Sequence, residues 1–483
     1  VDVFCLDCTS ALQDRFDEGQ PGRRGLRRTT PVANEVTMED LLQRASRLAA
    51  EYLRNLETRS VFPTVAAMNR LSQLDERLPD APEEPRNVLK ILDEIGSPAT
   101  VASAGGRYFG FVVGGSLPIA LATNWLATAW DQNAMSSASS PVAAKLEEVA
   151  IGWLLDLLNL PADSGGALVT GATMANFAAL AAARHAVLKR HGWDVEADGL
   201  CQSPPITVVV SEQVHPTLLK AAGLLGFGYN RLVRIPVDQQ GRMRADTLPP
   251  ISGPTIVCIQ AGNVSTGAFD PADEICQKVK TAGAWVHVDG AFGLWAAAAP
   301  NRRYLTAGIA GADSWATDAH KWLNVPYDSG LVFVRDKESL EASMTPPVAY
   351  LPQGQCREPW KSTPEASRRA RGVEIWAALR CLGRSGVADL IERTCGYATR
   401  FAKGLQEAGH AILNEVVLNQ VLVSFGSDDK TRRVLAAVQN DGTCWCSTAS
   451  WHGHTAMRIS VSSWATTGDD VARSLAAIVH AAD

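Results

Sequence analysis

Short apolar runs alternate with helical patterns between residues 168 and 334, and this alternation restricts the fold more than any other feature of the sequence. Such runs, bounded by Gly, Pro or polar residues, are typical of buried strands. We expect strands at Leu168–Val169, Thr207–Ser211, Leu232–Pro236, Thr255–Gln260, Ala284–Asp289 and Leu331–Val334, and helices at Met174–His191, Pro216–Leu225 and Asp273–Ala282. Strands that alternate with helices form a mainly parallel, doubly wound sheet, whose ligand crevice lies beyond the carboxyl ends of the strands. The sequence therefore predicts an α/β fold.

The flanking segments have other patterns. Apolar residues recur at helical spacing over Met38–Glu57, with Thr37 as a candidate N-cap, but these first helices are too few to form a core. We expect them to pack on the body or on a second subunit. A Pro- and Gly-rich stretch, 337–364, indicates a loop, and a long helix is expected over 365–382. The predicted division is a tail (1–36), an N-terminal helical segment (37–115), a large α/β domain (116–385) and a small α+β C-terminal domain (386–483).

Composition excludes several classes of protein. The net charge of −6, with both signs interspersed, argues against nucleic-acid binding, which requires a basic face. No apolar run approaches the ~18 residues of a membrane span, and no signal peptide is visible, so we expect a cytoplasmic enzyme. The Cys5-x-x-Cys8 and Cys444-Trp-Cys446 pairs lack a second half-site, which favours reduced thiols and no metal site.

Lys321 is the first candidate for chemistry. It follows His320 within the stretch 313–327, and the apolar runs 286–289 and 330–334 lie on either side. We therefore place Lys321 on a loop between two buried strands. An amine with little surrounding water has a lowered pKa, and a neutral amine is what Schiff-base chemistry requires. For an isolated His-Lys pair, a solvated loop lysine is the simpler interpretation.

Further residues supply the supports that pyridoxal phosphate (PLP) needs: an acid for the ring nitrogen, a stacking partner and a phosphate cradle. Asp289 ends a predicted strand, His215 follows another, and Thr173 precedes a helix whose N-terminus attracts anions. Ser314 is a second phosphate candidate, and the Asn263 loop also follows a strand. Each has a simpler alternative, with Asp289 as a cap, His215 as a core histidine and Ser314 as a turn residue. Their joint occurrence at strand ends favours a cofactor site.

At these residues the chain resembles the group II PLP-dependent amino-acid decarboxylases, the family of aromatic-amino-acid, glutamate and diaminobutyrate decarboxylases. The matching segments are Gly171–Asn176, Glu212–Pro216, His287–Ala291, Asp313–Trp322 and Met457–Val461. The resemblance implies the type I PLP-dependent transferase-like fold, a homodimer with shared active sites, and a small-molecule amino-acid substrate.

The resemblance also implies a role for each matching residue. Lys321 would bind the cofactor aldehyde with His320 beside it, and Asp289 would pair with the pyridine nitrogen. His215 and Ala291 would cover the two ring faces. The phosphate and the rest of the cofactor site would involve Ala172, Thr173, Ser314, Asn263 and Asp318.

Two positions depart from the family pattern. Asp318 stands where the family usually has Asn beside the phosphate, and no Tyr lies between Gln353 and Pro364, where aromatic decarboxylases carry a Tyr that protonates the substrate carbon. Tyr350 lies just before that stretch. We expect decarboxylation of an L-amino acid to the amine and CO2. The alternatives are a PLP-dependent aldehyde synthase, another carbon–carbon lyase, or a non-catalytic binding protein. The apolar stretch 108–115 suggests an aromatic substrate, with acidic and diamino substrates left open.

Overall fold

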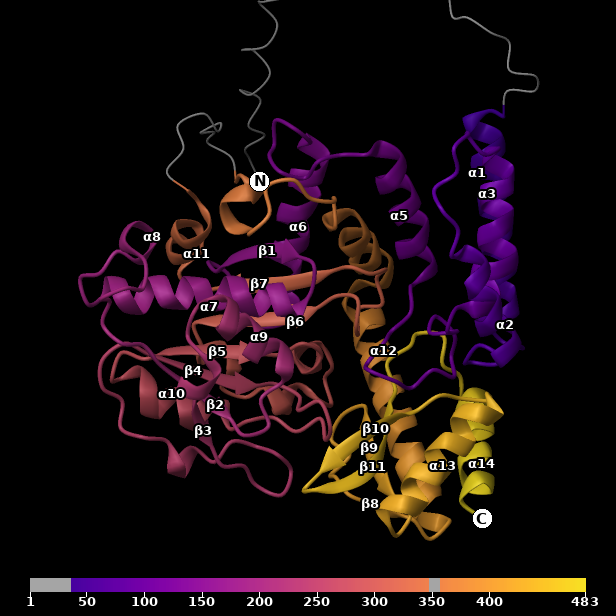
Figure 1. Ribbon diagram of the computed structural model, residues 1–483. Helices are drawn as coiled ribbons and strands as arrows, with labels where there is room; N and C mark the ends of the chain where they lie inside the picture. The colour runs from indigo at the N-terminus through magenta and orange to yellow at the C-terminus, as the bar shows by residue number, and fades with distance from the viewer. Residues whose placement is uncertain (1–35, 347–356) are drawn as a thin grey trace, which may run out of the picture.

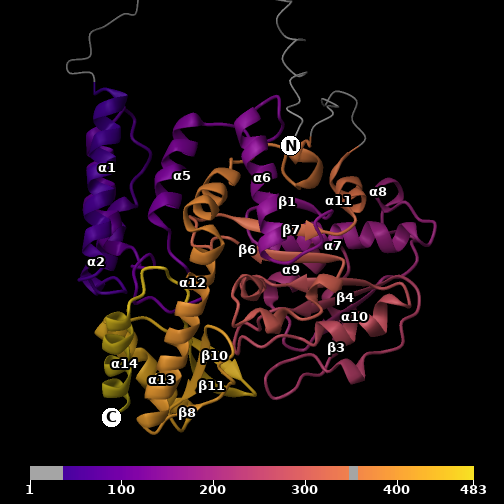
Figure 2. The same ribbon diagram turned by 180° about the vertical axis from the view of Figure 1, so that it is seen from behind.

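The computed structural model describes residues 36–346 and 357–483. The predicted tail, apart from residue 36, and Tyr350 lie outside the described residues. Three parts follow one another along the chain: N-terminal helices at one side, a large α/β domain, and a small C-terminal domain below (Figure 1). The long helix α12 (Gly372–Glu407) runs from the α/β domain into the C-terminal domain in both views (Figure 1, Figure 2). None of the helices in the described ranges has the length and apolar character to cross a membrane.

The central sheet has seven strands in the order β1-β7-β6-β5-β4-β2-β3. They are β1 (Gly165–Val169), β2 (Thr207–Ser211), β3 (Val233–Ile235), β4 (Thr255–Gln260), β5 (Trp285–Asp289), β6 (Ser314–Asp318) and β7 (Gly330–Val334). All neighbours from β6 to β3 pair in parallel, while β7 is antiparallel to both β1 and β6. The mainly parallel sheet predicted from the sequence is therefore confirmed.

The two faces of the sheet are covered by different helices. One face packs on α7 (Ala172–Lys189), α9 (Pro216–Leu224) and α11 (Lys337–Met344), and the other packs on α6 (Pro141–Leu157), α10 (Ala272–Lys280) and the first part of α12. Side chains alternate along each strand, so Val286 and Val288 enter the second core while Trp285 enters the first. α7 is buried along most of its length, and its N-terminus lies at the carboxyl edge of the sheet.

The C-terminal domain is a four-stranded antiparallel sheet in the order β10-β11-β9-β8, covered by helices. Its elements are β8 (Ala411–Ile412), β9 (Gln420–Ser424), α13 (Asp428–Asp441), β10 (Ser447–Trp451), β11 (His454–Ser460) and α14 (Gly468–Ala482). The second part of α12 closes its core. α12 consists of two helical segments that meet at a kink at Gly383 (φ 59°), close to the predicted end of the first helix at residue 382.

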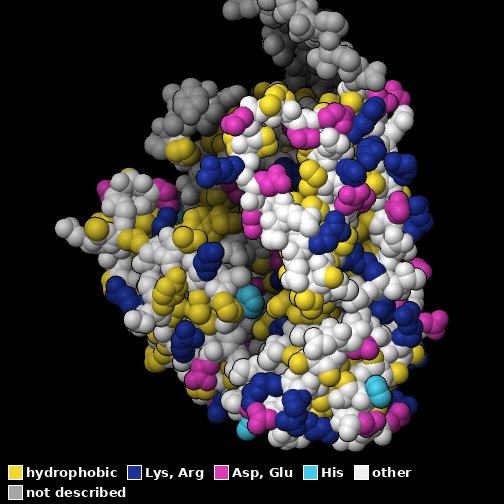
Figure 3. Space-filling model, turned by 45° about the vertical axis from the view of Figure 1, so that its right-hand side comes forward, with side chains coloured by type: hydrophobic (Ala, Val, Ile, Leu, Met, Phe, Trp, Pro, Cys, Tyr) yellow, Lys and Arg dark blue, Asp and Glu magenta, His cyan; other side chains and the backbone are white. Residues whose placement is uncertain are grey.

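The N-terminal helices cover little of the core. α1 (Met38–Asn55) begins with the predicted cap, since the Thr37 hydroxyl accepts the N–H of Asp40 and the Asp40 carboxylate accepts that of Thr37. None of the residues of α1, α2 (Val65–Arg70) or α3 (Pro85–Ile91) is buried. The remaining helices are α4 (Ser97–Ala99), α5 (Pro118–Trp130) and α8 (Val195–Asp198). In Figure 3, hydrophobic side chains lie along a hollow between the two halves of the face shown.

Three predictions about local structure were wrong. The stretch 337–364 contains helix α11, which Asp336 caps by accepting the N–H groups of Glu338 and Ser339. β6 was assigned to a loop, yet all five of its residues are buried between β5 and β7. The helix expected from residue 365 begins only at Gly372.

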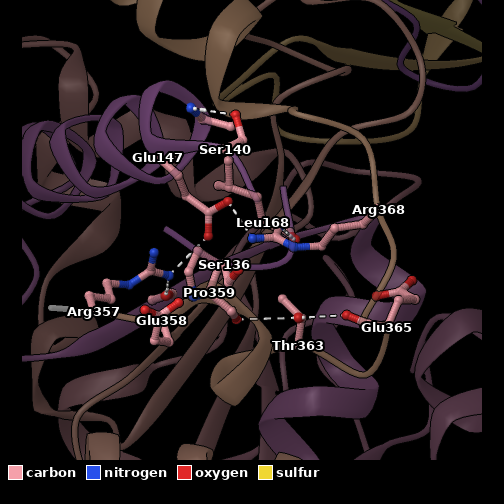
Figure 4. Close-up of polar contacts among 12 residues, drawn as sticks. Ser136, Ser140, Glu147, Leu168, Arg357, Glu358, Pro359, Thr363, Glu365 and Arg368 are labelled. Carbon is pink, nitrogen blue, oxygen red and sulfur yellow. Dashed lines mark hydrogen bonds and ion pairs between the residues drawn. The ribbon is translucent and has the colours of Figure 1, made fainter. Parts of the chain in front are cut away.

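The late start of α12 has a cause in a buried ion-pair cluster (Figure 4). The Arg368 guanidinium donates to the Leu168 carbonyl and to Glu147 Oε2 at 2.6 Å, while Arg357 donates to Glu147 Oε1 at 3.0 Å. Figure 4 shows the two arginines reaching Glu147 from opposite sides. These contacts hold residues 357–371, which include the short 3-10 helix Pro359–Ser362, against α6 and β1.

Candidate active site

Lys321 lies in the turn that follows β6, beside two titratable neighbours. Its Nζ is 2.9 Å from Asp318 Oδ2, at the last residue of β6. His320 Nδ1 accepts the backbone N–H of Ser329 at 3.0 Å, so the proton of the neutral ring is on Nε2, 3.7 Å from Asp318 Oδ2. Burial lowers the pKa of His320. Lys321 lies between two buried strands, as predicted, but the preceding strand is β6 and not the run 286–289.

The N-terminus of α7 meets this turn directly. A Cβ added at Gly171 would lie 3.3 Å from His320 Cε1 and 3.6 Å from Asp318 Oδ1, and one added at Gly330 would lie 2.4 Å from Gly171 Cα. Ala172 and Thr173 begin the helix, and the first N–H groups of a helix have no partner within it. These N–H groups and the helix dipole form an anion site next to Lys321.

Asp289 ends β5, the strand beside β6, and is buried. Its Oδ1 accepts the N–H of Ala291 at 3.2 Å, and its Oδ2 accepts from Asn176 Nδ2 at 3.2 Å. The carboxylate thus caps the turn after the strand, as the simpler interpretation expected. A carboxylate has about four lone-pair directions, so these two bonds leave room for a further donor.

His215 is the N-cap of α9 and is partly buried. Its Nδ1 accepts the Thr217 N–H at 3.3 Å and lies 2.7 Å from the Thr217 hydroxyl, which fixes the ring. Burial lowers the pKa of His215, and the charges of Lys321 and Arg458 lower it further, while that of Asp289 opposes them. The imidazole is therefore a neutral ring near both the lysine and the acid.

Ser314 and Asn263 take part in hydrogen bonds within the fold. Ser314, at the first residue of β6, is fully buried, and its hydroxyl is bonded to Trp285 Nε1 and His287 Nδ1, both at 2.9 Å. Asn263 Oδ1 accepts the N–H groups of Ser265 and Thr266 and so folds the turn after β4. The Ser314 hydroxyl is engaged in the fold and is not placed at the anion site, whereas Asn263 Nδ2 is buried without a hydrogen-bond partner among the described residues.

The structure adds Trp445 and shows the contacts of two segments already noted in the sequence, 108–115 and 457–461. Arg458 on β11 is buried beside this site, and its guanidinium donates to the Val264 carbonyl at 3.2 Å. The Tyr108 ring stacks on Trp445 at 5.1 Å, and Phe111 lies 5.4 Å from the same indole. The charged Arg458 inside an apolar strand was a sequence signal. The pairing of Trp445 with Tyr108 was not, because 336 residues separate the segments that meet there.

A family model described as "Pyridoxal-dependent decarboxylase conserved domain" matches residues 68–426. The chain belongs to this family. Tryptophan decarboxylase 1 of Oryza sativa subsp. japonica is 27% identical over 395 residues, covering 76% of each chain. The 4-hydroxyphenylacetaldehyde synthase of Rhodiola rosea is 27% identical over 369 residues, covering 73% of this chain and 74% of that one. The crystal structure of Oryza sativa TDC with PLP and tryptamine superposes with a TM-score of 0.85 at 22% identity, covering 93% of this chain and 99% of that chain.

These findings confirm the resemblance, the type I PLP-dependent fold, the PLP cofactor and the expected reaction class. The protein is a PLP-dependent amino-acid decarboxylase. The residues of this site fit the cofactor, since a lysine, a buried carboxylate and a free helix N-terminus meet at one sheet edge. Asp318 Oδ1 is also buried without a hydrogen-bond partner and faces Gly171 at that helix start.

Proposed function

We propose that Lys321, Asp289, His215 and the N-terminus of α7 form the cofactor site of this decarboxylase. The observation that carries the proposal is the meeting of Lys321, Asp318 and the start of α7 beside β5, the strand that ends in Asp289. PLP, when bound, supplies an electron sink for the electron pair left by the departing CO2. Lys321 would hold the aldehyde and Asp289 the ring nitrogen.

The other residues of the site would orient the cofactor. His215 and Ala291 would cover the two ring faces, and the N–H groups of Ala172 and Thr173 would hold the phosphate. Because its pKa is lowered, His215 would add no positive charge beside the ring nitrogen. Ser314 is left out of this set, since its hydroxyl is bonded to Trp285 and His287. Asn263 would keep its place at the cofactor, because its Nδ2 is buried without a hydrogen-bond partner in the described part of the chain.

Asp318 has a specific role in this proposal. A carboxylate beside a phosphate is repulsive unless it is paired, and here Asp318 Oδ2 is paired with Lys321 Nζ at 2.9 Å. The pair orients the amine and holds its proton at a defined atom until the lysine reacts. The substitution of the family's Asn by Asp318 is therefore compatible with a cofactor site.

The substrate we propose is an aromatic L-amino acid. Tyr108, Phe111 and Trp445 form a continuous aromatic surface, and planar rings favour stacking on such surfaces. The relatives named above act on tryptophan or form a hydroxyphenyl aldehyde, according to their names. The test is CO2 release from the twenty amino acids plus diaminobutyrate. Release from glutamate or diaminobutyrate alone would contradict the proposed substrate class.

A second candidate product is an aldehyde. It is favoured by the absence of Tyr between Gln353 and Pro364 and by the similarity to an aldehyde synthase. An aldehyde synthase consumes oxygen and releases hydrogen peroxide, whereas a simple decarboxylase does neither. Oxygen uptake measured together with CO2 release therefore separates the two products.

We also propose that the protein is a homodimer in the cytoplasm. Large exposed hydrophobic side chains concentrate on the N-terminal helices and on α5: Met38, Leu42, Leu53, Val65, Met68, Val88, Ile91, Trp125, Leu126 and Trp130. Many exposed apolar side chains in one part of a chain are typical of a subunit interface. The free cysteines among the described residues fit a reducing compartment.

A further inference from the structure

Five polar side chains form one continuous hydrogen-bond chain between the central sheet and α7, and the chain ends on Asp289. Trp285 Nε1 donates to Ser314 Oγ at 2.9 Å, and Ser314 Oγ lies 2.9 Å from His287 Nδ1. His287 Nε2 lies 2.8 Å from Asn176 Oδ1, and Asn176 Nδ2 donates to Asp289 Oδ2 at 3.2 Å. All five residues are buried.

The secondary structure explains why these residues meet. Trp285, His287 and Asp289 alternate along β5, so their side chains point to the face of the sheet that α7 covers. Ser314 lies opposite His287 in the register of β5 and β6. Asn176 is five residues after the α7 N-cap and faces the strand. The hydrogen-bond chain is therefore built from residues of β5, β6 and α7.

The two end groups of the hydrogen-bond chain, an indole N–H and a carboxylate, fix the direction in which every hydrogen bond in it is donated. An indole N–H only donates, so Ser314 Oγ accepts it and donates its own proton to His287 Nδ1. An ionised carboxylate only accepts, so Asn176 turns its amide nitrogen to Asp289 and its oxygen to His287 Nε2–H. The opposite direction would leave the serine proton without an acceptor and set an amide oxygen against a carboxylate. Burial lowers the pKa of His287 to about 3, which keeps the ring neutral, as this pattern requires.

We propose that Asn176 and His287 are positioning residues that hold the Asp289 carboxylate in one orientation toward the cofactor's ring nitrogen, with Ser314 setting the direction of the chain. The inference rests on the proposed function, in which Asp289 meets that nitrogen. Asn176 holds Oδ2, and the N–H of Ala291 holds Oδ1 from the other side. A carboxylate fixed at both oxygens requires no reorganisation when charge develops on the ring.

Ser314 thereby gains a role that differs from the one the sequence suggested. It does not reach the phosphate, but it fixes the imidazole tautomer that in turn fixes the Asn176 amide. The simpler alternative is that the five residues are only a satisfied polar patch within the core. The two interpretations differ in whether removal of one of the five side chains changes the protonation of the cofactor's ring nitrogen.

The experiment uses holoenzyme reconstituted with PLP labelled with 15N in the pyridine ring. The 15N chemical shift reports whether the ring nitrogen is protonated, and the dissociation constant of PLP and the melting temperature are measured on the same samples. For Asn176→Ala and His287→Phe we expect a shift toward the unprotonated nitrogen. We also expect PLP to bind ~10-fold more weakly, the scale of one lost hydrogen bond to a charged group.

A conservative variant and a distal variant complete the design. A Gln side chain can place an N–H near the position of histidine Nε2, so His287→Gln should restore the wild-type 15N shift. Ser314→Ala removes only the distal hydroxyl and should move the shift in the same direction by a smaller amount. If Asn176→Ala and His287→Phe do not fold, Ser314→Ala decides the question.

The outcomes separate this inference from the proposed function. An unprotonated ring nitrogen in the wild type would overturn the assignment of Asp289 itself, and with it this inference. A protonated nitrogen in the wild type with an unchanged 15N shift in the folded variants would overturn only the positioning role. A lowered melting temperature with an unchanged shift would identify the chain as core packing.

Discussion

Replacing Glu147 by Gln tests the buried ion-pair cluster that anchors residues 357–371 on the α/β domain. Glu147 and Arg368 are each 1% exposed at the side chain, and the second arginine, Arg357, is 25% exposed. The Glu147→Gln substitution would keep the size of the side chain but leave a buried guanidinium without its countercharge. Breaking a buried pair by removing one partner costs about 3–5 kcal/mol, so we expect the free energy of unfolding to fall by ~3 kcal/mol or more.

The neighbouring Glu148 offers a matched control. It lies in the same helix, its side chain is 54% exposed, and its partner Lys145 is 3.1 Å away on the surface. An exposed pair contributes ~0–1 kcal/mol, so Glu148→Gln should be nearly neutral. Both variants would be measured by urea denaturation in the presence of PLP. Losses that agree within ~0.5 kcal/mol would refute the reasoning, because burial would then make no difference.

Three further results are expected. The Asp289→Asn variant should still bind PLP through Lys321, but its turnover should fall by at least ~100-fold, the scale of one lost electrostatic partner. A lowered Tm with normal turnover of the PLP-loaded variant would instead show that Asp289 is only a strand cap. Acid should destabilise the fold, because burial lowers the pKa of His287 to about 3 and the unfolded chain then binds a proton that the folded chain does not. The contribution of His287 to the free energy of unfolding is fully present above the unfolded pKa of ~6.5 and is lost as the pH falls toward 3. This loss amounts to ~2 kcal/mol between pH 7 and 5. In urea titrations at different pH values, His287→Gln should lack this part of the decline. Light scattering should give the mass of a dimer at micromolar concentration, and an active monomer would contradict the proposed interface.

The elements that the sequence predicted best are those with uniform apolar runs. β2 and β4 have the predicted bounds, since each is an uninterrupted apolar run with a polar residue at either end and lies in the parallel part of the sheet. β6 was missed because Ser314, Thr317 and Asp318 interrupt its apolar pattern, and its burial comes from neighbouring strands that lie apart in sequence. Periodicity reports a local preference and contains no information on such neighbours.

The candidate site, like the fold, was predicted from the sequence only in part. Asp289 was expected at the ligand-binding edge, because the carboxyl ends of parallel strands lie at one edge of a sheet. Lys321 lies at the same edge because it follows β6, the neighbour of β5, which the sequence pattern did not predict. The engagement of Ser314 with His287 depends on the register of two strands, which the sequence pattern does not reveal. Likewise, the pairing of Asp318 with Lys321 depends on the conformation of the turn after β6, so a departure from the family pattern became interpretable only in three dimensions.

The most direct test of the account is the location of the cofactor on the chain. Borohydride reduction of the PLP-loaded protein converts the bond between lysine and cofactor to a stable amine, and peptide mass mapping then identifies the modified lysine. We expect a single adduct on Lys321, abolished in Lys321→Ala together with the visible absorption band of the bound cofactor. An adduct on another lysine, or none on a protein that still releases CO2 from its substrate, would contradict the central claim.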